Sequence, residues 1–400
     1  MTTRKVFRKP LILLPMLLVL ISITYIACKR TAEAVGPAYY SAPAGFTPIL
    51  NIPDSTINFK VKSLAPSNNL GSKVTWTLTY KGLTSGATKT FSGSSDVIDQ
   101  SNALWNGGHD GIYFFKTGEK VEATLSFLGT NYVTTDYVRV ITPRDYTVGN
   151  PNLVAVGVNY ATNKANNGYE NGSEIGFSNQ FAFGSGRPHC YDPDPAKAPF
   201  ARPVKGTFIE AVEGNYYFKM KGVSYDADGY FIAGLQHRKA GFFFPTWTDP
   251  DKIYFNVYIY GQGNSGQEDS TINTIFNLEF HEADLSNNAS KPKNECGVSN
   301  AQLINACALI GKNEHDPCTD DGWVYQIPVT HTGWKLFSVQ YSKFTPSPSA
   351  VNGGSGNKIM EPSRVARIQV GIVSTPAHAV GYGIFDYPVI TYGAPFDPNN

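Results

Sequence analysis

Strict alternation of apolar residues with polar or aromatic ones, clearest between residues 253 and 282, most constrains how this chain can fold. In residues 253–260 the apolar members are Ile253, Phe255, Val257 and Ile259, and those between them are Tyr254, Asn256, Tyr258 and Tyr260. Strand side chains point alternately to two faces, so we expect one face in a core and the other carrying rings and hydrogen-bonding groups. Two further segments share this design: Phe276, Leu278 and Phe280 alternate with Asn277, Glu279 and His281, and Ile368, Val370 and Ile372 with Arg367 and Gln369.

The composition extends this prediction to the whole chain. Aromatic residues make up 13% and charged residues 16% of the 400 residues, and the chain has 38 Gly, 23 Tyr and 24 Phe. Such usage is typical of twisted sheets with many turns. The nearest candidate for a helix, residues 299–310, is about three turns long and lies in a loop-like region. We therefore expect an all-β protein.

Residues 45–145 are expected to form an immunoglobulin-like sandwich. Short alternating segments at 57–62, 74–80, 88–91, 121–127 and 137–141 are separated by turns rich in Gly, Asn and Ser. Trp76 alternates with threonines and is predicted to lie in the core. The run Leu104-Trp105-Asn106-Gly107, followed by residues 115–118, resembles bacterial immunoglobulin-like spacer modules. A polar break after Tyr146 separates this domain from residues 151–400.

The second part resembles the galactose-binding-like jelly rolls of carbohydrate-binding modules. The resemblance rests on Asp321-Gly322-Trp323, on residues 332–339 (TGWKLFSV) and 341–344 (YSKF), and on a closing strand at residues 383–390. It implies a larger jelly-roll β-sandwich, with long loop insertions, that binds glycan. In that family an aspartate at the position of Asp386 often supports a structural calcium. No other cofactor is expected.

The N-terminus has the order of a secretory signal. Arg4, Lys5, Arg8 and Lys9 precede an apolar run over residues 11–27 that stops at a cysteine. Tyr25-Ile26-Ala27-Cys28 resembles the bacterial lipobox, which implies cleavage after residue 27 and a diacylglyceryl group on Cys28. Residues 28–44 then form a tether. The alternative is an uncleaved anchor helix, because seventeen apolar residues nearly span a bilayer.

This layout resembles the surface glycan-binding lipoproteins of Bacteroidota. It implies a location in the outer membrane, attachment to the membrane through the lipid and a glycan importer as partner. Lys29 and Arg30 stand where surface-exposed members carry acidic residues, so a periplasm-facing position stays open beside surface display. Removing the four basic residues of the signal leaves 29 basic and 32 acidic residues, a net charge of −3. No nucleic-acid partner is expected, because phosphates require a basic face.

Four cysteines follow Cys28, and an even number in an exported chain favours disulfides. The candidates are Cys190, Cys296, Cys307 and Cys318, which allow three pairings. The alternative is a zinc site made by Cys296, Cys307, His315 and Cys318, although the spacing lacks the paired knuckles of common structural sites.

The polar and aromatic faces are the predicted ligand-binding site. Rings supply contact for the C–H faces of sugars, and polar side chains satisfy their hydroxyls. The predicted members are Trp247 as an exposed rim contact, Tyr254, Asn256, Tyr258, Tyr260, Asn277, Glu279, His281, Arg367 and Gln369. The alternative is that the tyrosines form an ordinary solvent-facing or covered side of a sheet.

The sequence contains no nucleophile elbow, phosphate-binding glycine loop or zinc-helix pair, so we expect a binding protein and no enzyme. A glycoside-cleaving carboxylate pair would leave no local motif, but Glu279 and Glu282 differ in parity and face opposite sides. The rival to glycan binding is a structural or adhesive lipoprotein that binds a protein through the same sheet.

Overall fold

The computed structural model describes residues 39–156, 200–223, 231–238, 242–263, 270–272, 274–282, 321–347, 358–373 and 380–399. These residues form strands β1 to β16, and their helices are short 3-10 turns: η3 (Pro250–Lys252), η4 (Tyr341–Lys343) and η6 (Pro362–Arg364). Within these ranges no helix has the length and apolar character needed to cross a membrane. The prediction of an all-β fold is confirmed. Cys28, the other four cysteines and His315 lie outside the described residues.

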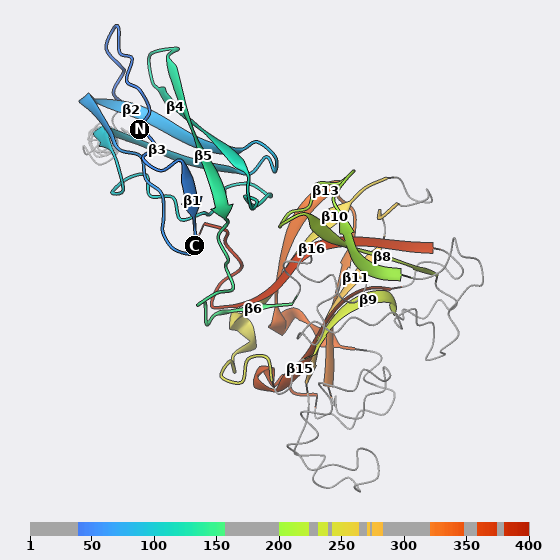
Figure 1. The fold of residues 1–400 in the computed structure, drawn as a ribbon. Helices are drawn as coiled ribbons and strands as arrows, with labels where there is room; N and C mark the ends of the chain where they lie inside the picture. The colour runs from blue at the N-terminus through green and yellow to red at the C-terminus, as the bar shows by residue number, and fades with distance from the viewer. Residues whose placement is uncertain are drawn as a thin grey trace, which may run out of the picture.

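The first sheet is formed by the N-terminal half of the described chain (Figure 1). Its members are β1 (Thr56–Asn58), β2 (Asn68–Gly82), β3 (Thr88–Ile98), β4 (Lys120–Phe127) and β5 (Val133–Thr142). The order is β1-β5-β4-β2-β3, in which β1 is parallel to β5 and the other neighbours are antiparallel. The buried face alternates along β4 with half-buried residues, as the sequence pattern predicts.

The core of the first unit lies between this face and the connecting segments. Trp76 is buried on β2, as predicted, and its Nε1 donates to Ser95 Oγ at 2.9 Å. Trp105, from the motif before β4, is fully buried and stacks on Tyr80 at 4.5 Å. Its Nε1 donates to the Gly108 carbonyl at 2.8 Å, so the indole is satisfied inside the core.

The second part contains two sheets. The six-stranded sheet contains β13 (Gly333–Gln340), β10 (Ile253–Gly261), β16 (Val380–Tyr392), β8 (Tyr216–Val223) and β7 (Phe200–Lys205) in that order, with β6 (Leu153–Ala155) paired to β16. The five-stranded sheet contains, in order, β14 (Thr345–Pro346), β12 (Asp321–Pro328), β11 (Ile275–Glu282), β15 (Val365–Val373) and β9 (Phe231–Arg238).

These two sheets bury their apolar faces against each other. Their shared core includes Phe255, Val257 and Ile259 of β10, Phe276, Leu278 and Phe280 of β11, and Ile368, Val370 and Ile372 of β15. A Cβ on Gly383 of β16 would lie 2.5 Å from Ile372 Cγ2, which shows how closely the sheets approach at this point. The predicted β-sandwich is thus present, and the apolar sets read from the sequence are its core.

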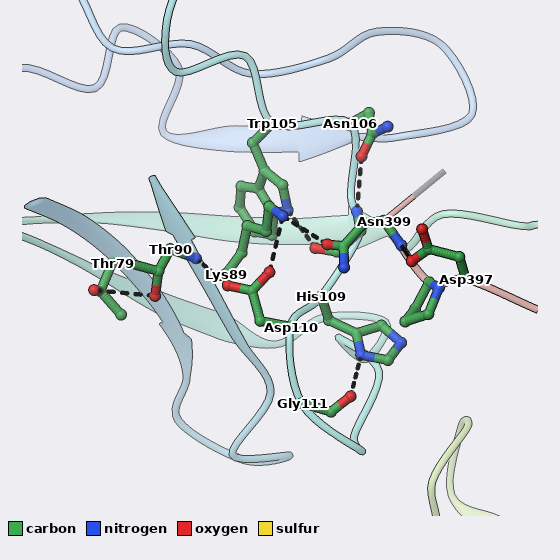
Figure 2. A network of polar contacts seen from close by, with 12 residues as sticks. Thr79, Lys89, Thr90, Trp105, Asn106, His109, Asp110, Gly111, Asp397 and Asn399 are labelled. Carbon is green, nitrogen blue, oxygen red and sulfur yellow. Dashed lines mark hydrogen bonds and ion pairs between the residues drawn. The ribbon is translucent and has the colours of Figure 1, made fainter. Parts of the chain in front are cut away.

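The first unit and the sandwich meet through an aromatic cluster. Phe114 and Tyr146 of the first unit pack with Tyr258, Trp334, Tyr387 and Phe396. The chain after β16 runs back to the first sheet, where Lys89 Nζ donates to Asn399 Oδ1 at 2.6 Å (Figures 1 and 2). His109 lies beside this tail with its Nδ1 2.9 Å from the Gly111 carbonyl, and burial lowers its pKa to about 4. The ring is therefore neutral at physiological pH.

Candidate functional site

The sandwich divides the predicted site residues between its two outer faces. Tyr254, Asn256, Tyr258 and Tyr260 lie on β10 of the six-stranded sheet, whereas Asn277, Glu279, His281, Arg367 and Gln369 lie on β11 and β15 of the five-stranded sheet. Both sets alternate with core residues, so both point away from the shared core and from each other. The single platform expected from the sequence is wrong in this respect.

On β10, two of the predicted ligand contacts have structural roles. Tyr258 is 2% exposed and packs against the first unit, with its ring centroid 6.2 Å from that of Phe114. Asn256 is fully buried; its Nδ2 donates to Thr391 Oγ1 at 3.0 Å, and its Oδ1 accepts from the Phe396 amide at 3.0 Å. A side chain that binds a ligand needs free donors or acceptors. Those of Asn256 are already used by adjacent segments of the protein.

Trp247 is also placed differently from the prediction. It is 6% exposed and stacks between Phe244 at 4.8 Å and Tyr392 at 5.1 Å, so it is a core residue and not an exposed rim contact. Tyr254 and Tyr260 are half-buried. The Tyr254 hydroxyl accepts from Gln340 Nε2 at 3.1 Å, and the Tyr260 ring meets Trp334 edge-on at 5.1 Å.

The five-stranded sheet brings together the other half of the predicted set. In register, Glu279 stands opposite Gln369 and His281 opposite Arg367, so that directly paired residues share one face. His281 Nε2 lies 2.7 Å from Glu279 Oε2, and Gln369 Nε2 donates to the same oxygen at 3.4 Å. We call Asn277, Glu279, His281, Arg367 and Gln369 the polar ladder.

Within the polar ladder, His281 lies between a guanidinium and a carboxylate. Arg367 Nη2 lies 2.8 Å from His281 Nδ1 and 3.2 Å from Nε2, and Nε2 lies 2.7 Å from Glu279 Oε2. The imidazole thus connects the cation of Arg367 to the carboxylate of Glu279.

One member of this face was missed by the sequence analysis. Gln326 of β12 stands opposite Asn277, and its Nε2 donates to Asn277 Oδ1 at 3.2 Å. The alternation of Trp323, Tyr325 and Ile327 with Val324 and Gln326 was the available signal. Asn277 Nδ2 in turn lies 3.4 Å from Glu279 Oε1, which joins Gln326 to the ladder.

The polar ladder is closed off from solvent, since its members are 2–5% exposed. Buried polar groups of this kind are stable only when they are hydrogen-bonded. A ligand that uses them must therefore reach a face that the protein shields, and must replace hydrogen bonds that the ladder makes internally.

A second buried carboxylate, Glu282, lies on the opposite face at the end of β11. Its Oε1 accepts from the Tyr341 hydroxyl at 2.6 Å and the Glu361 amide at 2.7 Å, and its Oε2 accepts from Trp323 Nε1 at 3.0 Å. Burial raises the pKa of Glu282 to about 7 despite these three donors. From the sequence alone, Glu282 stood out only as an unsuitable partner for Glu279.

Asp386, the predicted calcium position, accepts hydrogen bonds from backbone amides. Its Oδ2 accepts from Val212 at 2.8 Å and Glu213 at 3.1 Å, and its Oδ1 accepts from Tyr387 at 2.8 Å. Burial raises the pKa of Asp386 well above its ordinary value. Among the described residues no group of three or more His, Cys, Asp or Glu is arranged to hold a metal ion. The structure therefore gives Asp386 a role in capping these backbone amides.

Comparison with known proteins gives limited likenesses. No protein-family model matches the sequence, and no curated protein is similar to it. A family 11 carbohydrate-binding module of a cellulosomal cellulase of Clostridium thermocellum overlaps 49% of this chain and 82% of its own, with 12% identity and a TM-score of 0.30. The same kind of module from that organism, in complex with a β-1,3-1,4-mixed-linked tetrasaccharide, covers 49% of this chain and 83% of its own at 12% identity and a TM-score of 0.29.

A third structure, from a study of carbohydrate-binding modules of the β-sandwich superfamily, covers 86% of this chain and 98% of its own, with 10% identity and a TM-score of 0.30. Scores of this size describe a partial overlap of strands. The function has to be inferred from the residues of the site.

Proposed function

We propose that this protein is an outer-membrane lipoprotein that binds carbohydrate without cleaving it, through the polar ladder of β11 and β15. The observation that carries the proposal is the convergence of two amides, a carboxylate, an imidazole and a guanidinium on one sheet face. Two extended strands space these groups along a line, which suits an oligosaccharide.

The donor and acceptor types of the ladder fit hydroxyl groups. A sugar hydroxyl both donates and accepts, and side-chain amides such as Asn277 and Gln369 can do the same. Glu279 supplies acceptors and Arg367 supplies donors. Because these ladder side chains are shielded from water, such hydrogen bonds would be stronger than at an exposed surface.

Glycoside cleavage would require a second carboxylate across the bond to be broken. Among the described side chains of this face, Glu279 is the one carboxylate, and Glu282 lies on the opposite side of β11. This supports binding without hydrolysis, and incubation with the bound polysaccharide should release no reducing ends.

The glycan proposal is tested with the full-length lipoprotein by calorimetry and affinity electrophoresis against a polysaccharide panel that includes a β-1,3-1,4-mixed-linked glucan. Gln369→Ala is expected to weaken binding by about tenfold or more, because a hydrogen bond in a desolvated site is worth about 1 to 3 kcal/mol. Tyr254→Ala is the matched control on the other sheet and should leave affinity unchanged. Failure of every glycan to bind, or equal effects of the two variants, would contradict the proposal.

Lipid anchoring is tested separately by labelling cells with an alkyne analogue of a fatty acid. The wild-type protein should take up the label, and Cys28→Ala should not. A wild-type protein that stays in the membrane without label would instead be held by an uncleaved helix.

A further inference from the structure

One end of the first unit carries exposed apolar side chains from three neighbouring segments. They are Tyr39 (71% exposed), Tyr40 (36%), Ile49 (78%), Leu128 (45%) and Val133 (50%), which we call the apolar pole. It lies where β4 ends and β5 begins.

Hydrogen bonds hold the three segments together. The Ala42 amide donates to the Leu128 carbonyl at 2.8 Å, and the Leu50 amide donates to Thr134 Oγ1 at 3.1 Å. Phe46 packs edge-on against Phe127 with ring centroids 5.0 Å apart. The exposed side chains therefore project from one ordered end of the sheet and not from separate loops.

The apolar pole lacks charge over long stretches of sequence. No Asp, Glu, Lys or Arg occurs between Glu33 and Asp54, or between Glu122 and Asp136. The charges nearest to it are Lys73, whose ammonium lies 4.5 Å from the centre of the Tyr40 ring, and the exposed Asp96 on the paired segment of β3. The opposite end of the unit differs: there Lys60 pairs with Asp145 at 3.4 Å and Lys62 with Asp54 at 2.7 Å.

The chain reaches this end directly from the predicted anchor. Ten residues, 29–38, separate Cys28 from Tyr39. Ten residues span at most about 35 Å when fully extended and about 18 Å as a flexible coil. The sandwich joins the first unit at the other end, through Phe114 and Tyr146. A lipid on Cys28 would therefore hold the apolar pole close to the bilayer and the polar ladder away from it.

We propose that the apolar pole rests in the interfacial region of the bilayer and orients the protein on the membrane. This inference rests on the lipid anchoring proposed above. Tyrosine rings suit the headgroup level, and aliphatic side chains gain free energy by leaving water at the acyl boundary. With the lipid and tether alone, the protein would be free to tilt on the membrane. Contact through the apolar pole gives the protein a second attachment point.

Tryptophan reporters test this contact. The five native tryptophans, Trp76, Trp105, Trp247, Trp323 and Trp334, are all buried, so a new exposed indole can be distinguished from them. Ile49→Trp places the reporter on the pole, and Val61→Trp places it near the opposite end of the unit at the same exposure of 78%. The purified lipidated proteins are reconstituted into vesicles that contain brominated phosphatidylcholine, a quencher of tryptophan fluorescence.

Ile49→Trp is expected to be quenched several-fold more than Val61→Trp, with an emission shift to the blue. Leu128→Trp should behave like Ile49→Trp. It is a second reporter on the pole, so the test still stands if Ile49→Trp misfolds. Equal quenching at the two ends, in protein that floats with the vesicles, would overturn the membrane contact while leaving the anchor intact. Protein that fails to float would overturn the anchor and this inference together.

Discussion

Glu282 shows how one buried side chain links stability to pH. Tyr341, Trp323 and the Glu361 amide all donate to its carboxylate, yet removal from water has the larger effect and raises its pKa to about 7. The folded state therefore holds a proton that the unfolded chain, with a pKa of about 4.5, releases more easily. When folding raises the pKa of a carboxyl group, its contribution to stability is complete below the pKa of the unfolded state. That contribution is lost as the pH rises through the pKa of the folded state.

The free energy of unfolding should accordingly fall as the pH rises from about 4.5 to above 7, by on the order of 3 kcal/mol from this group. Glu282→Gln should remove this component because an amide does not titrate in that range. Urea unfolding of both proteins at several pH values measures the difference. An unchanged slope in the variant would assign the pH dependence to other groups, and Glu361→Gln, a partly exposed neighbour, serves as control.

The sequence predicted which face of each strand a side chain occupies, but not what covers that face. The alternation placed Phe255 and Leu278 in the core correctly, because the two-residue period is a property of the strand itself. Tyr258 and Trp247 were misjudged because burial by another sheet or by distant aromatic rings leaves no periodic trace in the sequence. The pairing of Glu279 with Gln369 depended on strand order, which alternation does not encode.

At the level of elements, the pairing of β10 with β16 contains a bulge. Asn256 stands opposite Val389 and Tyr258 opposite Asp386, so Val257 alone faces Tyr387 and Pro388. Tyr387 adopts a left-handed φ of 48°, which costs about 1 to 2 kcal/mol in a residue with a side chain. Asp386 offsets this by accepting the Tyr387 amide, and Asn256 accepts the amide of Phe396 beyond the strand.

Asn256→Ala should lower the free energy of unfolding by about 2 to 4 kcal/mol, because the Phe396 amide and the Val389 carbonyl would lose their partner inside the protein. The loss is read from the urea midpoint at constant slope. Asn215→Ala, at an exposed position before β8, should change it little. A small effect of Asn256→Ala would mean that water replaces the side-chain amide, which would contradict the complete burial of this position.

At the level of the whole molecule, the aromatic cluster joins the first unit to the sandwich, and we expect the two to unfold together. Phe114 meets Tyr387 at 4.7 Å and Phe396 at 6.2 Å, and its amide donates to the Val212 carbonyl at 2.9 Å. Lys116 pairs with Glu210 beside it, and burial lowers the pKa of the lysine. If the first unit is anchored as proposed, a joint of this kind would hold the polar ladder at a fixed distance from the membrane.

Phe114→Ala should weaken this joint by about 3 kcal/mol or more, as expected for the loss of a large buried ring. In a calorimetric scan we expect one transition for the wild-type protein and two for Phe114→Ala, since each unit keeps its own core. Leu83→Ala, at a position 52% exposed on the first unit, is the control and should leave one transition. One transition in Phe114→Ala as well would show that the units are coupled by other contacts.

The position of β16 in the larger sheet makes that sheet depend on long-range pairing. This strand, residues 380–392, lies between β10 and β8 and hydrogen-bonds to both, although it comes after every other described strand in the sequence. The first sheet, by contrast, is complete once residue 142 is available. Long-range pairing of this kind is slow and leaves strand edges open to aggregation. The larger sheet can therefore close only when residues 380–392 have joined both β10 and β8, whereas the first sheet needs nothing beyond residue 142.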